Sequence, residues 1–216
     1  MKKILIVEDQ RLHREYMESI IRNSGRYELV PSVTAADLAA EICRKTRIDL
    51  ILMDIAVNGS MDGIEAAGYI KKLFPAVKIV IVTSMLDEMC LIRAKDAGVD
   101  SMWYKDVSGE ELLDVIDSAM SDDRIFPASS PEVTVGNCNS GDFTKTENSI
   151  LREIVNGLSN KQIADKLGTS ENTVNWHVKN LLSKTGLSNR TMLAISAVRG
   201  NLFIAENREE PPKEVK

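Results

Sequence analysis

Five short apolar runs, separated by segments with helical spacing, dominate the first half of this 216-residue chain. Three of the runs are almost wholly apolar, as strands buried on both faces of a parallel sheet are. Between the runs, apolar residues recur every three or four positions, which predicts helices. A regular alternation of strand and helix predicts an α/β fold with a doubly wound, five-stranded parallel sheet. The expected strands cover residues 2–7, 27–33, 48–53, 78–83 and 101–105.

The periodicity changes in the second half of the chain. Residues 125–142 are rich in Pro, Ser, Gly and Asn, which is typical of a linker. From Thr144 onward every segment has helical spacing, and a last helix is expected over about residues 190–204. The pattern predicts an α/β domain, then a small all-α domain, then a disordered polar tail. Their expected ranges are 1–124, 143–205 and 206–216.

Charge is distributed unevenly over a chain whose net charge is −5. Residues 1–124 hold 16 Lys and Arg against 22 Asp and Glu, whereas residues 143–205 hold 8 against 4. The second, basic domain is therefore the one expected to meet a polyanion. No apolar stretch approaches the roughly 20 residues that a membrane-spanning helix needs. We therefore expect a cytoplasmic protein that makes no membrane contact.

Polar side chains close four of the five predicted strands. Glu8 and Asp9 follow the first, Asp54 the third, Thr83 ends the fourth and Lys105 ends the fifth. Because the carboxyl ends of parallel strands meet at one edge of a sheet, we expect these side chains to converge on one pocket. Crowded acids repel one another unless a positive charge lies among them, and oxygen ligands suit Mg²⁺. Such a site can accept a phosphoryl group on one carboxylate.

With these residues in this order, residues 1–121 resemble the receiver domain of bacterial response regulators. The resemblance implies that Asp54 accepts a phosphoryl group from a sensor histidine kinase. It also implies that Thr83 is the switch hydroxyl group that turns toward the acyl phosphate. Lys105 would supply the ammonium group that pairs with that phosphate.

The same resemblance implies a Mg²⁺ site. Asp9 and Asp54 would bind the ion directly, Glu8 would bind it through water, and the backbone carbonyl of Ala56 would complete the set. The sequence departs from the family three residues before Lys105, where Met102 replaces the usual aromatic switch residue.

Residues 158–186 have the layout of a helix-turn-helix. An amphipathic helix is followed by a short turn at residues 168–170 and a second helix, which Ser170 or Thr169 can cap. An exposed second helix with positive charge fits the major groove of DNA. There Asn can pair with adenine edges, and Lys with guanine or phosphate.

Three stretches resemble the LuxR-type helix-turn-helix: residues 144–147 as T-x-x-E, 157–164 as G-L-S-N-K-Q-I-A and 173–178 as T-V-N-W-H-V. Together with a receiver, this organisation is similar to the NarL/FixJ family of response regulators. The resemblance implies double-stranded DNA as partner, read in the major groove on paired half-sites by a homodimer when active. By position, the expected DNA contacts are Lys161, Thr173, Asn175, Trp176, Lys179 and Lys184.

Two further features of this half follow from the same resemblance. Family members often carry Lys where this chain has Asn175, which is expected to change the bases that are read. The last helix often mediates the DNA-bound dimer in the family. In this chain, the apolar residues expected to form that surface are Leu193, Ile195, Ala197 and Val198.

The predicted function is a two-component response regulator in which phosphorylation of Asp54 controls dimerisation and sequence-specific DNA binding. A DNA-binding regulator with an atypical receiver that acts without phosphorylation is the alternative. An enzyme with a receiver-like magnesium site and a helical protein-interaction module are rivals from other classes. Because the sequence has no G-x-S-x-G elbow and no P-loop, we predict that the chain is not an enzyme.

Overall fold

A computed structural model describes residues 1–105 and 111–203. The chain divides into two compact units, Met1–Pro131 and Glu132–Lys216. The predicted tail at 206–216 and the predicted end of the last helix at Ile204 lie outside the described residues. No helix of the described part is both long and apolar enough to cross a bilayer.

The first unit contains a five-stranded parallel sheet with the strand order β2-β1-β3-β4-β5. This order, in which the chain leaves the middle of the sheet in both directions, confirms the predicted doubly wound fold. The strands are β1 (Lys2–Val7), β2 (Tyr27–Leu29), β3 (Leu50–Met53), β4 (Lys78–Thr83) and β5 (Ser101–Tyr104). The helices are α1 (Arg11–Ser24), α2 (Ala36–Lys45), α3 (Gly63–Leu73), α4 (Glu88–Asp96) and α5 (Leu112–Met120).

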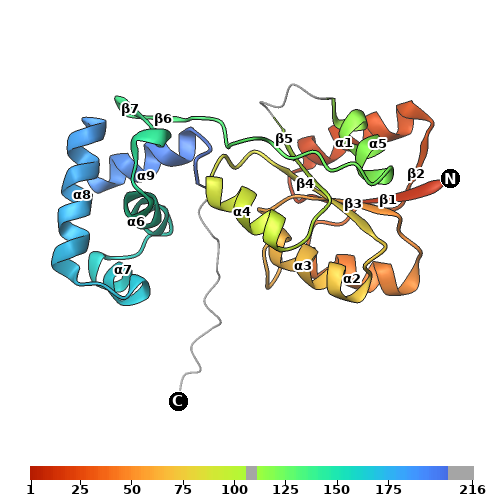
Figure 1. Ribbon diagram of the computed structural model, residues 1–216, viewed down its shortest axis with the longest axis horizontal. Coiled ribbons are helices and arrows are strands. Elements are labelled where there is room, and N and C mark those ends of the chain that lie inside the picture. The colour runs from red at the N-terminus through yellow and green to blue at the C-terminus, as the bar shows by residue number, and fades with distance from the viewer. Residues whose placement is uncertain (106–110, 204–216) are drawn as a thin grey trace, which may run out of the picture. The chain divides into compact units, whose positions relative to one another are not determined.

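Helices cover both faces of the sheet, with α1 and α5 on one face and α2, α3 and α4 on the other (Figure 1). Each strand therefore contributes to two cores. In β3, Leu50 and Leu52 pack in the core beneath α1 and α5, whereas Ile51 and Met53 pack beneath α2, α3 and α4. Burial on both faces explains why these strands are runs of Val, Ile, Leu and Met instead of an alternating pattern.

The register of the sheet aligns the carboxyl ends of the strands. Met53 pairs with Val7 on one side and with Ile81 on the other, and Thr83 pairs with Tyr104. The residues that follow β1, β3 and β5 therefore emerge at one edge, close to the end of β4.

The second unit begins with a small antiparallel hairpin within the segment that was expected as a linker. Its strands are β6 (Thr134–Val135) and β7 (Cys138–Asn139), and a single 3-10 turn, η1 (Ser140–Asp142), follows. The hairpin turn is bonded to the helices of the unit: Asn137 N donates to Thr185 O at 2.9 Å, and Gly136 N to Ser196 Oγ at 3.1 Å. Gly136 has φ +62°, and a Cβ there would lie 2.2 Å from Thr185 O.

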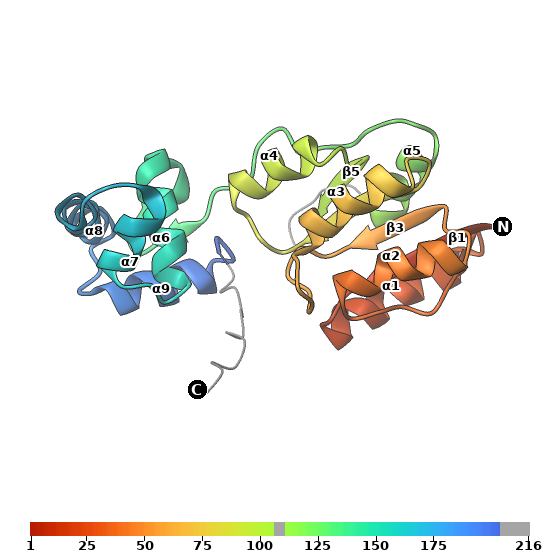
Figure 2. The same ribbon diagram turned by 90° about the horizontal axis from the view of Figure 1, so that it is seen from below.

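Four helices complete the second unit: α6 (Lys145–Val155), α7 (Asn160–Leu167), α8 (Glu171–Thr185) and α9 (Arg190–Arg199). They form one cluster with α8 at its rim in both views (Figures 1 and 2). Fully buried side chains from each helix fill the centre, among them Leu151, Ile163, Leu181 and Leu193. These helices confirm the predicted helical second domain, to which the structure adds the hairpin.

Candidate functional sites

The structure brings the five predicted pocket residues to the same edge of the sheet. Glu8 and Asp9 directly follow β1, Asp54 follows β3, and Lys105 follows β5. Thr83 is the last residue of β4, and its carbonyl oxygen accepts a hydrogen bond from Lys105 N at 3.0 Å. This edge is where open α/β folds bind their ligands.

Three carboxylates form the centre of this pocket. Glu8, Asp9 and Asp54 each offer one oxygen atom, and the three atoms lie within 4.8 Å of one another. The Glu8 and Asp54 residues are only 0% and 2% exposed, so water screens little of their mutual repulsion. Among the described residues, the buried Asp9 Oδ1 has no hydrogen-bond partner. An unpartnered acceptor among clustered acids fits a bound cation with hard oxygen ligands.

Lys105 supplies the positive charge of the pocket in this structure. Its Nζ lies 2.6 Å from Glu8 Oε2 and 3.0 Å from Asp54 Oδ2, and its side chain is 6% exposed. Burial of Asp54 raises the pKa of its carboxyl group; Lys105 opposes this effect and the charge of Glu8 reinforces it, leaving a pKa of about 7. One ammonium group therefore compensates only part of the charge of the cluster.

Backbone contacts fix the second oxygen and the main chain of Asp54. Ile55 N donates to Asp54 Oδ1 at 2.7 Å, so the carboxylate is held from both sides. Gly63, the first residue of α3, packs against Asp54 so closely that a Cβ on it would lie 1.9 Å from Asp54 O. Ala56, predicted to offer its carbonyl group, lies two residues after Asp54 and is partly exposed.

The Thr83 hydroxyl group is fully buried and engaged locally. Its Oγ1 accepts a hydrogen bond from Met85 N at 3.0 Å. Met102, which replaces the usual aromatic residue, is 1% exposed within β5. Tyr104, two residues later, is also buried, and its hydroxyl group lies 2.8 Å from Ser130 Oγ. The aromatic side chains of β5 are thus part of the packed core.

One neighbour of the pocket was missed by the sequence analysis. His13 Nδ1 lies 3.4 Å from Lys105 Nζ. Together with Tyr16, Met17 and Trp103, these two residues line a cavity of about 330 Å³. The only sequence signal was the position of His13, one turn of α1 after the acidic pair, and a single histidine on a helix is weak evidence for a site.

The second candidate site is the helix-turn-helix formed by α7 and α8. Gly168 ends α7 with φ +64°, the left-handed conformation that glycine adopts at low cost. Ser170, one of the two caps that the sequence allowed, accepts a hydrogen bond from Thr173 N at 3.1 Å and begins α8. Val174 and Val178 lie on the buried face of α8, and the opposite face of the helix is exposed.

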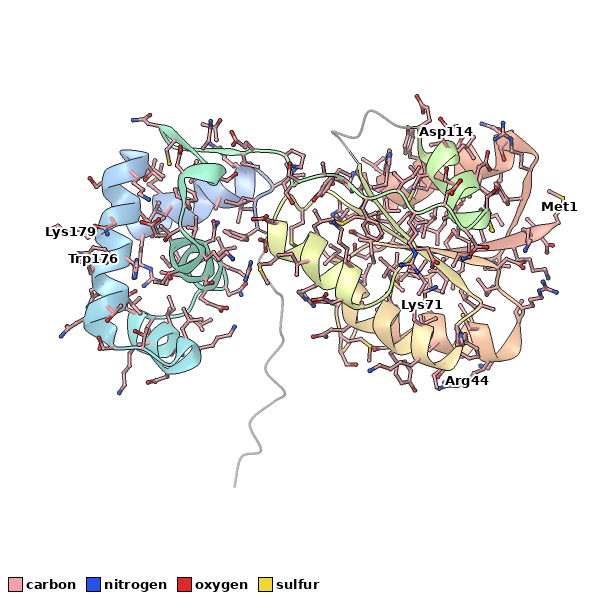
Figure 3. All side chains as sticks on the ribbon, in the orientation of Figure 1. Met1, Arg44, Lys71, Asp114, Trp176 and Lys179 are labelled. Atoms are coloured by element: carbon pink, nitrogen blue, oxygen red, sulfur yellow. The ribbon has the colours of Figure 1, made fainter. Side chains whose placement is uncertain are left out.

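All six expected DNA contacts are exposed residues of α7 and α8. Trp176 is 60% exposed, a large value for a tryptophan, and it neighbours Lys179 on the outward side of α8 (Figure 3). Lys161, Thr173 and Asn175 are exposed as well. Asn175 Oδ1 accepts a hydrogen bond from Asn160 Nδ2 at 2.6 Å.

Lys184, the sixth expected contact, is bound within its own unit. Its Nζ lies 2.8 Å from Glu147 Oε2 and donates to Asp142 O at 3.0 Å. Glu147 also belongs to a capping box with Thr144 at the start of α6. Burial raises the pKa of Glu147, but hydrogen bonds from Lys184 and Thr144 outweigh it and leave the pKa below its usual value.

Substituting methionine for Lys184 is expected to destabilise the second unit by about 1–2 kcal/mol at pH 7, since Glu147 would lose its cationic partner. Because its folded pKa is depressed, Glu147 contributes stability above its unfolded pKa, and that contribution is lost as the pH falls through the folded value. The loss in the variant should therefore shrink in acid. Urea unfolding at pH 7 and pH 3.5 measures both effects, and Lys145→Met, at an exposed position of α6, is the matched control. If Lys184→Met were as stable as the parent at pH 7, the pairing of Lys184 with Glu147 would not stabilise this unit.

The apolar surface of α9 differs from the predicted one. Leu193 and Ala197 are completely buried against the rest of the unit, because they lie on the face of α9 that packs on the other helices. The exposed apolar residues of this helix are Met192, Ile195 and Val198, at 41%, 44% and 42%. The predicted surface is therefore corrected to these three side chains.

Comparisons with known proteins identify the families of both domains. The model of the response regulator receiver domain matches residues 4–117, and that of bacterial regulatory proteins of the luxR family matches residues 142–197. The response regulator protein VraR of Staphylococcus aureus is 33% identical over 209 residues, which cover 93% of this chain and 98% of VraR. An uncharacterized transcriptional regulatory protein of Bacillus subtilis, YhcZ, is 33% identical over 208 residues, covering 93% of this chain and 97% of YhcZ.

Solved structures show the same fold. One is RcsB from Salmonella enterica serovar Typhimurium, bound to a promoter in the presence of the phosphomimetic BeF3⁻. It is 19% identical with a TM-score of 0.58, covering 90% of this chain and 96% of that chain. A LuxR-family response regulator from Aurantimonas sp. is 27% identical with a TM-score of 0.54, covering 60% of this chain and 89% of that chain.

The fold, the acidic pocket and the two family matches define this protein as a two-component response regulator. It belongs to the NarL/FixJ type, in which a receiver domain is joined to a LuxR-type DNA-binding domain. Such regulators are transcription factors and not enzymes, which agrees with the expectation from sequence.

Proposed function

We propose that this regulator is switched by transfer of a phosphoryl group from a sensor histidine kinase to Asp54. The observation that carries the proposal is the buried cluster in which Asp54 lies between Glu8, Asp9 and Lys105. In the transfer, the bond from phosphorus to the kinase histidine nitrogen breaks, and its electron pair stays on that nitrogen. A bond from phosphorus to a carboxylate oxygen of Asp54 forms at the same time.

We propose that Mg²⁺ is the cation of the pocket, held by Glu8, Asp9, Asp54 and the carbonyl group of Ala56. When bound, it would neutralise charge on the phosphoryl oxygen atoms. The donor set supports this choice, since it consists of oxygen atoms alone and leaves Asp9 Oδ1 without a partner in the part of the chain that the structure describes. The clustering of the three carboxylates supports their part in this site, whereas the Ala56 carbonyl group is proposed from the resemblance alone.

Two side chains would then respond to the acyl phosphate. Lys105 Nζ, now shared by two carboxylates, can pair with a phosphoryl oxygen. The Thr83 hydroxyl group can donate its proton to another phosphoryl oxygen if it leaves its contact with Met85 N. Because Met85 lies in the segment between β4 and α4, this exchange would reshape that segment and transmit the change.

For the second unit we propose that α8 enters the major groove of double-stranded DNA. Asn175, Trp176 and Lys179 would reach base edges or the groove, and Lys161 and Thr173 would contact phosphates. Lys184, which pairs with Glu147, would reach a phosphate only with the part of its ammonium group left exposed. Structures of RcsB, described as two dimers bound to two parallel DNAs, support a homodimer on paired half-sites.

The test is phosphorylation with Mg²⁺ and a small phosphodonor, followed by measurement of mass, oligomeric state and DNA affinity. The parent should gain one phosphoryl group and bind promoter DNA roughly 5- to 150-fold more tightly, the usual range for allosteric coupling. Asp54→Asn should do neither, whereas Asp123→Asn, at an exposed carboxyl group, should behave as the parent. Equal DNA binding before and after phosphorylation would instead favour the regulator that acts without it, in line with the buried Met102.

A further inference from the structure

Three polar side chains from three different helices form a hydrogen-bonded chain near the N-terminal end of α8. Arg190, the first residue of α9, donates from Nη1 to Asn160 Oδ1 at 2.9 Å and from Nη2 to the carbonyl oxygen of Leu158. Asn160, the first residue of α7, donates from Nδ2 to Asn175 Oδ1 at 2.6 Å. Asn175 lies in the second turn of α8, on its exposed face.

The chemistry of arginine fixes the direction of this chain. A guanidinium group has donors only, so Asn160 must turn its oxygen toward Arg190. The Asn160 amide nitrogen then faces Asn175, which can receive it only with its own oxygen. The Asn175 amide nitrogen is left pointing away from Asn160, and it has no protein partner among the described residues.

We propose that Asn160 is a positioning residue for base recognition, because it makes Asn175 present a hydrogen-bond donor to the major groove. The inference rests on the proposed function of α8 and adds to it which base atoms are read. A donor matches the acceptors of the groove: purine N7, guanine O6 and thymine O4. The bidentate pairing of asparagine with adenine needs Oδ1 and Nδ2 to face the base together, and in this chain the hydrogen bond from Asn160 turns the Asn175 Oδ1 toward Asn160 instead.

The expected signature is a weak distinction between adenine and guanine at the base pair next to Asn175. Both purines offer N7 in the same place, so the parent should accept them with affinities within about threefold. Asn160→Ala frees Asn175 for bidentate pairing. Asn160→Asp keeps an acceptor for Arg190 but draws the Asn175 amide nitrogen inward, which turns the Asn175 oxygen toward the groove. In both variants the preference for adenine over guanine should rise roughly tenfold or more.

The measurement is selection of bound duplexes from a randomised pool by the full-length, phosphorylated protein, with sequencing of the bound fraction. Relative base preference is the readout, because the charge added by Asn160→Asp changes contact with phosphates equally for all sequences. Asn175→Ala and the double variant Asn160→Asp/Asn175→Ala complete a cycle: without Asn175, the Asn160 substitution should leave the adenine-to-guanine ratio unchanged. Circular dichroism and thermal unfolding check that each variant is folded.

The outcomes separate this inference from the proposed function. If the parent enriches a sequence and the ratio is the same in the parent and both Asn160 variants, the positioning role is overturned while DNA reading by α8 stands. A parent that already prefers adenine over guanine by tenfold would also overturn the positioning role and leave DNA reading by α8 in place. If the parent enriches no sequence, sequence-specific DNA reading fails and takes the inference with it. A raised ratio in both variants that vanishes without Asn175 establishes the role.

Discussion

The substitution Gly63→Ala is expected to destabilise the receiver by about 3–5 kcal/mol and to slow phosphorylation of Asp54 severely. A Cβ at this position would lie 1.9 Å from Asp54 O and 2.8 Å from Asp54 C, distances that no rotamer change can relieve because both atoms belong to the main chain. Either α3 moves away from the sheet edge or the main chain of Asp54 moves. Urea unfolding and the rate of phosphorylation by a small donor measure the two consequences.

Gly68→Ala on the same helix is the matched control. Its Cβ would lie 3.5 Å from Ala97 Cβ, an ordinary van der Waals contact. Because Gly in the interior of a helix costs about 0.5–1 kcal/mol relative to Ala, this variant should be as stable as the parent or slightly more so. If Gly63→Ala kept the stability of the parent to within about 1 kcal/mol, the close approach of α3 to Asp54 would not be a constraint on the site.

Lys105→Ala is expected to destabilise the receiver by about 3 kcal/mol at pH 8 when divalent cations are chelated, because it leaves buried carboxylates without their cationic partner. The pH dependence has a definite sign. The folded pKa of Asp54 is raised to about 7, so the folded protein binds more protons than the unfolded chain. Stability attributable to this group therefore falls as the pH rises from about 4 through 7.

In Lys105→Ala, the fall in stability with rising pH should be steeper. Mg²⁺ should restore much of the stability lost at pH 8, because it replaces the missing positive charge. Urea unfolding at pH 5.5 and 8, with chelator and with Mg²⁺, gives all four values for each protein. The control is the double variant Asp54→Asn/Lys105→Ala, in which removal of one carboxylate should recover stability without the cation. A single variant as stable as the parent in chelator at pH 8 would show that Lys105 does not compensate the cluster.

The receiver could be predicted almost completely from the sequence, because its strands are buried on both faces. Residues 78–83 were expected as a strand and form β4 with the same bounds. The second expected strand, 27–33, is reduced to Tyr27–Leu29, since Pro31 has no N–H group for a ladder. In α1, helical spacing alone does not identify the buried face: Leu12 and Tyr16 are 80% and 56% exposed, whereas Met17 and Ile21 are buried.

Contacts between distant segments account for the rest. The composition of residues 125–142 indicated a linker, but a hairpin of two-residue strands carries too little periodicity to be recognised. Lys184 was expected as a DNA contact, and its pairing with Glu147, which spans 37 positions in sequence, could not be predicted. The link from Arg190 through Asn160 to Asn175 depends in the same way on three helices that only the tertiary fold brings together.

The hairpin at the start of the second unit has a mechanical consequence. Its turn holds the last carbonyl group of α8 through the bond from Asn137 N to Thr185 O, and Gly136 packs so closely there that a Cβ on it would lie 2.2 Å from Thr185 O. The polypeptide that leaves the receiver is therefore joined at one turn to two helices, to α9 through Gly136 and to the end of α8 through Asn137. Any displacement of the connecting chain would reach α9 and α8, the helix that we propose reads DNA, together.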